Sequence, residues 1–174
     1  GAIRAHVERR FAESARAESP ITHLIIERVF PDAFYARLAA AWPSLELFKR
    51  DKAGRKYDLV PADSGPDSRS AGYDRVSPED RAVWAFFVGT VNRAIVGPLL
   101  AKVFEQEIAD RLDKIKHAHE AGLIGYAMAG ARDWTFRANN GRMMIRGNGY
   151  ELKPHVDSMP YLVTALHYFP DDGG

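Results

Sequence analysis

The residues best suited to chemistry are His155 and Asp157, in the run Pro154-His155-Val156-Asp157. They follow a strand-like segment, and residues two apart on a strand project to the same face. An imidazole nitrogen and a carboxylate oxygen can therefore converge on one metal ion. With a second histidine they would complete the two-histidine, one-carboxylate triad, which holds ferrous iron and leaves three coordination positions open. The pair thus predicts two ligands of a metal centre.

The sequence around this pair is more informative than the pair itself, because chance gives roughly one His-x-Asp in every two chains of this composition. Before the pair come a strand-like run from Arg142 and an Asn148-Gly149 turn. After it come an apolar run that contains Thr164 and Tyr168, and then the acidic, glycine-rich residues 170–174. The order of these features, more than the pair alone, therefore supports a metal-binding role for His155 and Asp157.

This order resembles the first strands of the double-stranded β-helix core of prolyl-hydroxylase-like Fe(II)/2-oxoglutarate-dependent oxygenases. The run from Thr22 to Phe34 also resembles the strand and helix that precede that core. The resemblance implies that His155 and Asp157 bind Fe(II) and act in catalysis. It further implies that 2-oxoglutarate and O2 are consumed while a C–H bond of a small-molecule or peptidyl substrate is oxidised. The sequence does not identify that substrate.

Three more residues match positions of this family and are candidate cofactor-binding residues. Tyr168 matches the tyrosine whose hydroxyl, in some members, binds the distal carboxylate of 2-oxoglutarate. Thr164 shares the face of Tyr168 if the segment is a strand. Arg146 lies where members place a polar contact to the cosubstrate or the substrate, although a surface arginine is an equally good interpretation.

The family pattern also contains a distal histidine, followed by a basic residue that pairs with 2-oxoglutarate. We expect both in residues encoded after Gly174, so that the printed chain holds two of the three protein ligands. His167 does not fill the distal position, because it follows Asp157 too soon and alternates with Tyr168 along the same segment.

Helical patterns dominate the first two thirds of the chain. The best supported helix begins after Ser77, because a serine cap, Pro78 in the first turn and two following acids all favour a helix start. A stripe of apolar residues then has the spacing of a buried helix face, namely Trp84, Phe87, Val88, Val91 and Ile95. The other predicted elements are helices at 5–17 and 31–41, a strand at 22–27, a loop at 49–76 that is either functional or disordered, and a second long helix after a break at Gly97-Pro98.

Strand-like runs follow Gly122, at 123–128, 134–137, 143–146, 150–153 and 161–169. Helices first and strands afterwards indicate an α+β protein whose helices pack on one side of a β-sandwich or barrel. With the resemblance, that core is a double-stranded β-helix (jelly-roll or cupin-like) that is incomplete in this chain. We predict a single domain over 1–174, with a mainly helical support region at 1–121 and the first core strands at 122–174.

The composition favours a globular enzyme over several other classes. The chain has 174 residues, of which 46% are hydrophobic and 27% charged, and its formal net charge is +1. This balance argues against nucleic acid as a partner, and no apolar run reaches the ~20 residues of a membrane span. Cysteine is absent from the sequence, which excludes thiolate ligands. We expect a cytoplasmic protein and leave a homodimer open.

Two alternatives stay open at this point. One is a non-catalytic β-sandwich domain that binds a ligand or a partner and keeps the His-x-Asp by descent or chance. The other is a cupin-like metalloenzyme that does not use 2-oxoglutarate. A histidine some tens of residues after Gly174, followed by an arginine or lysine, would favour the oxygenase over both.

Overall fold

The computed structural model describes residues 1–52, 55–59, 71–121, 143–146 and 163–169. These residues form helices and two small antiparallel sheets, so the chain is of the α+β class. The helices are α1 (Ala2–Glu13), α2 (Asp32–Ala40), α3 (Pro78–Phe86), α4 (Gly97–Val103) and α5 (Glu105–Glu120), with a π-helical segment η4 (Phe87–Val96) and 3-10 turns η1 (Leu45–Leu47) and η3 (Ala71–Arg75). The strands are β1 (Arg16–Ala17), β2 (His23–Leu24), β3 (Lys49–Arg50), β4 (Lys56–Leu59) and β5 (Met143–Arg146).

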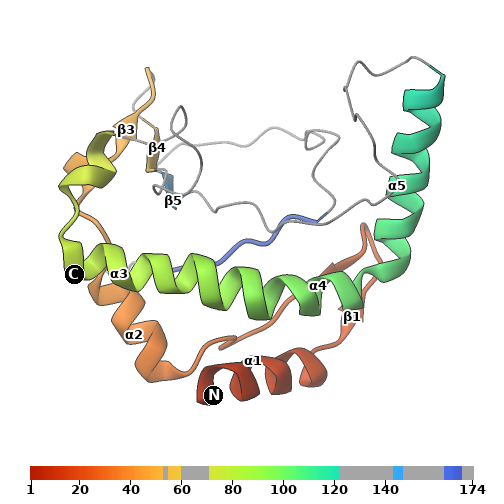
Figure 1. The fold of residues 1–174 in the computed structure, drawn as a ribbon, viewed down its shortest axis with the longest axis horizontal. Coiled ribbons are helices and arrows are strands. Elements are labelled where there is room, and N and C mark those ends of the chain that lie inside the picture. Colours follow the sequence, from red (N-terminus) through yellow and green to blue (C-terminus); the bar gives the residue numbers. More distant parts are fainter. Residues whose placement is uncertain (53–54, 60–70, 122–142, 147–162, 170–174) are drawn as a thin grey trace.

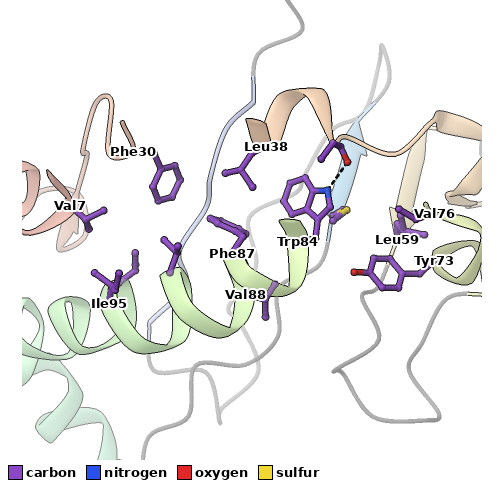
Figure 2. Close-up of a cluster of buried hydrophobic side chains, with 14 of the residues drawn as sticks. Val7, Phe30, Leu38, Leu59, Tyr73, Val76, Trp84, Phe87, Val88 and Ile95 are labelled. Carbon is purple, nitrogen blue, oxygen red and sulfur yellow. Dashed lines mark hydrogen bonds between the residues drawn. The ribbon is translucent and has the colours of Figure 1, made fainter. Parts of the chain in front are cut away.

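One continuous helix, Pro78–Val103, runs through the middle of the molecule and comprises α3, η4 and α4 (Figure 1). It begins as predicted: the Ser77 hydroxyl accepts a hydrogen bond from the Asp80 amide at 3.0 Å. The predicted apolar stripe is buried, and its side chains meet those of α1, α2 and the loop that contains Phe30 (Figure 2). This helix is therefore the element on which the helical layer is built.

The predicted break at Gly97-Pro98 is wrong, because the helix continues through the proline. Proline has no N–H, and its ring crowds the carbonyl four residues earlier, here that of Ala94. The helix widens before this point, so that the Gly97 amide donates to the Asn92 carbonyl, five residues back. Arg4 of α1 then donates to the Ala94 carbonyl at 3.0 Å. The carbonyl that Pro98 cannot bond thus has a partner from another helix.

By length and composition alone, the 26-residue helix Pro78–Val103 could cross a membrane. This differs from our expectation that the chain has no segment of that kind. A core helix of a soluble protein meets the same criteria, and here Trp84, Phe87 and Val91 are buried against the neighbouring helices and loops. The burial of that stripe favours a core helix.

The N-terminal elements are tied to the second half of the long helix and to α5. Arg4 bonds the Ala94 carbonyl of η4, whereas Arg16 donates to the Val103 carbonyl at the end of α4 at 3.1 Å and forms an ion pair with Glu107 of α5 at 2.8 Å. Helix α1 ends at Glu13 rather than at 17, because Arg16–Ala17 instead pairs with His23–Leu24 in a two-stranded sheet. The strand predicted at 22–27 is confirmed only over that pair.

The second sheet has the strand order β3-β4-β5, and both strand pairs are antiparallel. It confirms the strand predicted at 143–146 and adds two strands within the stretch 49–76, where we expected a loop. The strands predicted at 123–128, 134–137 and 150–153 lie outside the described residues, and no double-stranded β-helix is seen within the described ones. Residues 163–169 form no strand, in contrast to the prediction, and run beside the long helix (Figure 1).

The hydroxyl of Ser77 should contribute measurably to stability. We expect Ser77→Ala to lower the free energy of unfolding by about 1 kcal/mol, because it removes an N-cap hydrogen bond. Ser44 is a matched control, since it precedes η1 but makes no side-chain cap bond. Ser44→Ala should change stability by less than about 0.5 kcal/mol. Urea unfolding followed by circular dichroism measures both, and equal losses would contradict the cap.

Candidate functional site

The two predicted metal ligands, His155 and Asp157, lie outside the described residues. The structure does describe the segments that come before and after them in the chain, β5 and residues 163–169. Of the predicted site residues, it therefore describes Arg146, Thr164 and Tyr168. Their surroundings show what these two segments can offer a ligand.

Arg146 is the last residue of β5 and lies opposite Lys56 in the sheet. Its guanidinium is 3.5 Å from the carboxylate of Asp58, which also accepts an ion pair from Lys56 at 3.2 Å. A second guanidinium nitrogen contacts the sulfur of Met144 at 2.7 Å. The side chain is thus already engaged within the sheet, and any ligand of Arg146 would share it with the carboxylate of Asp58.

Residues 163–169 are held to the helical layer by two aromatic side chains. The His167 ring lies 5.3 Å from that of Phe30 and 5.4 Å from that of Phe87, centroid to centroid. Figure 2 shows Phe30 and Phe87 on either side of this segment, which is drawn in faint blue. The segment therefore lies between the loop before α2 and the long helix.

Phe169 anchors the same segment two residues further on. Its ring stacks on that of Tyr35 at 5.4 Å with an interplanar angle of 8°. It also contacts Trp42 at 5.4 Å and Trp84 at 6.1 Å. Because residues 167 and 169 both face the helices, the segment keeps the two-residue alternation of an extended chain although it is not paired in a sheet.

The side chains next to these anchors are exposed. Tyr168 is 81% exposed and Leu166 is 57% exposed, and Thr164 is exposed as well. The predicted alternation holds from Leu166 to Phe169, but Ala165, which it places on the side of His167, is also exposed. Among the described residues, none is hydrogen-bonded to the Tyr168 hydroxyl, so this group is available to a ligand.

Burial lowers the pKa of His167 below its ordinary value. The cause is desolvation, because an imidazolium loses its hydration when it packs between aromatic rings. His167 is therefore neutral near pH 7. Its ring lies against Phe30 and Phe87, on the side of the segment away from Tyr168.

The aromatic cluster that receives this segment was not predicted from the sequence. Trp84 was expected in the core, but Tyr35 and Trp42 come from one stretch of sequence and Phe169 from another, and no local pattern indicates that they meet. Within the described part of the chain, no group of three or more His, Asp or Glu side chains could hold a metal ion. His117 on α5 instead donates a local hydrogen bond from Nδ1 to the Asp113 carbonyl at 2.8 Å.

Comparisons with known proteins found no relative: no protein-family model, no curated protein and no solved structure matches the chain. The class that the fold defines is thus α+β, with an extended segment packed into a helical layer, and no family is assigned.

Adjacent residues of this segment should differ sharply in their contribution to stability. We expect Phe169→Ala to lower the free energy of unfolding by about 2 kcal/mol or more, because a packed aromatic ring is lost. Tyr168→Ala is the matched control and should cost less than about 0.5 kcal/mol, because its side chain is exposed. Urea denaturation of both variants tests this, and a larger loss in Tyr168→Ala would contradict the orientation of the segment.

Proposed function

We propose that the protein is an Fe(II)- and 2-oxoglutarate-dependent oxygenase whose core is a double-stranded β-helix. The proposal rests on His155-x-Asp157 in its sequence context, from Arg142 to the acidic end of the chain. One structural observation supports it: in the segment after the pair, the side chains of Tyr168 and Thr164 are exposed rather than buried in the helical layer. These are the two residues of the segment that the proposal assigns to cosubstrate binding.

The donor set of the pair suits ferrous iron. Imidazole and carboxylate are ligands that Fe(II) accepts, and two of them leave room for a further protein ligand and for the cosubstrate. His155 and Asp157 would hold the metal together with a histidine encoded after Gly174. The oxidant would be O2: bound Fe(II) would activate it, and one oxygen atom would enter the C–H bond while the other enters succinate as 2-oxoglutarate loses CO2.

The residues of the segment 163–169 would bind and orient the cosubstrate. The Tyr168 hydroxyl can donate a hydrogen bond to a carboxylate of 2-oxoglutarate, and Thr164 lies on the same side. His167 and Phe169 fix this arrangement, because their rings are packed against the helices. In this proposal the helical layer orients Tyr168 and Thr164 but does not itself contact 2-oxoglutarate.

The substrate that is oxidised is a small molecule or a peptide that the described residues do not identify. We propose that the reaction takes place in the cytoplasm. The net charge of +1 gives no reason to invoke a nucleic acid.

The pair itself provides the first test. We expect the full-length protein, extended past Gly174, to convert 2-oxoglutarate to succinate in the presence of Fe(II) and O2. His155→Ala and Asp157→Ala should each abolish this turnover and weaken Fe(II) binding, since each removes a ligand. His117→Ala is the control and should retain activity, because His117 is exposed on α5.

Two other outcomes of that experiment would contradict the proposed oxygenase. Metal binding through the pair without consumption of 2-oxoglutarate would favour the cupin-like metalloenzyme. Turnover that is unchanged in both ligand variants would remove the pair from the mechanism.

Tyr168 provides a second test that separates binding from chemistry. We expect Tyr168→Phe to raise the KM for 2-oxoglutarate by about tenfold, because a hydrogen bond to a charged group contributes about 1.5–3 kcal/mol. The stability of the variant should not change, because the side chain is exposed. Tyr57→Phe, in β4, is the matched control and should leave the KM unchanged. Steady-state assays at varied 2-oxoglutarate measure both, and an unchanged KM in Tyr168→Phe would argue against this role.

A further inference from the structure

His167 lies between two parts of the helical layer that are far apart in sequence. Its ring contacts Phe30, which precedes α2, and Phe87, at the start of η4. Phe30 and Phe87 also contact each other, at 5.5 Å in an edge-to-face arrangement. The imidazole is thus the third ring of an aromatic cluster whose other two members cannot ionise.

The charged groups on the elements around this cluster are engaged elsewhere. Arg28 and Asp32 flank Phe30, and Asp32 is the first residue of α2. Both side chains are exposed, and they form an ion pair with each other at 2.9 Å. His6 of α1 lies 3.0 Å from the Arg28 carbonyl. These groups therefore bond to one another or to backbone, and burial lowers the pKa of His167.

The long helix and α2 contribute no charge to this cluster either. Arg37 of α2 pairs with Glu79 at the start of the long helix, at 2.9 Å, and both side chains are exposed. Asp80 bonds to the Ser77 hydroxyl at 2.8 Å, and Arg81 comes next along the helix. Arg93, on η4, is exposed. No carboxylate therefore compensates an imidazolium in this cluster, within the part of the chain that the structure describes.

A proton on His167 consequently weakens the packed arrangement. The pKa of a histidine in an unfolded chain is about 6.5, and that of the packed ring is lower. Between these two values the released segment binds more protons than the packed one. The stabilisation is therefore complete above pH 6.5 and decreases as the pH falls through this window.

We propose that His167 is a pH-sensitive latch, whose protonation releases residues 163–169 from the aromatic side chains of α2 and the long helix. Two structural features support it. Residues 163–169 form no strand, and the rings of His167 and Phe169 pack against the helical layer. Release would also move Tyr168 and Thr164, which lie on the other side of the same segment. The latch does not depend on the oxygenase activity.

Tryptophan fluorescence can report the release directly. Trp42 and Trp84 both contact the Phe169 ring, and Trp134 is the third tryptophan of the chain. In a Trp134→Phe background, only the two reporters at the cluster emit. We expect a reversible change in their emission between pH 8 and pH 5, with a midpoint below 6.5. Far-UV circular dichroism should stay constant, because residues 163–169 contribute no helix.

Variants of His167 identify the group that titrates. His167→Phe keeps an aromatic ring in the cluster and should abolish the fluorescence transition, whereas His117→Gln, an exposed histidine on α5, should leave it intact. If His167→Phe does not fold, His167→Leu serves the same purpose, and the ring of the unmodified protein can be titrated by NMR.

Three results would overturn the latch. The first is a transition that persists in the His167 variants. The second is a loss of helical signal in step with the fluorescence, which would indicate global unfolding. The third is a His167 ring that titrates at or above pH 6.5. A transition confined to the segment and abolished only with His167 would establish it.

Discussion

The indole of Trp84, on the long helix, joins that helix to the end of α2 and to residues 163–169. It is only 3% exposed, and its N–H donates to the carbonyl of Ala41, at the end of α2, at 2.7 Å. Its ring meets Trp42 edge-on at 5.6 Å and Phe169 at 6.1 Å. A buried indole must satisfy its N–H, which fixes where α2 ends relative to the long helix. The position of residues 163–169 follows from this arrangement.

The same constraint decides which side chains of that segment are available. A segment that presents His167 and Phe169 to an aromatic surface must present Leu166 and Tyr168 to the opposite side, because successive residues of an extended chain alternate. Single apolar side chains are commonly exposed on protein surfaces, and here the helices take the rings of His167 and Phe169. Packing against the helical layer therefore determines which side chains of residues 166–169 are exposed.

Features encoded by neighbouring residues were predicted well. The helix start at Ser77-Pro78 depends on residues within one turn, and the alternation around His167 depends on a simple period of two. The features that failed depend on residues far away in sequence. Pro98 alone predicts a break, but the freed carbonyl of Ala94 is bonded by Arg4, 90 positions before Ala94. Residues 163–169 have the composition of a strand, yet the rings that receive them come from two distant stretches, 30–42 and 84–87. Local pattern could therefore not reveal that the segment packs without a sheet partner.

For the candidate site, the sequence predicted the ligand pair, and the structure describes the segments that precede and follow it in the chain. Asp58 at 3.5 Å from Arg146 is a contact between β4 and β5, which no pattern within either strand could indicate. The orientation of Tyr168, in contrast, was already implied by its spacing from His167.

The bonds from Arg4 and Arg16 to the long helix also bear on how the chain is made. Arg4 lies in α1, which ends at Glu13, but the carbonyls that Arg4 and Arg16 bond belong to Ala94 and Val103. At a synthesis rate of roughly 5–20 residues per second, α1 emerges about 5–20 seconds before its partner helix exists. During that interval Val7 and Phe11 have no long helix to pack against.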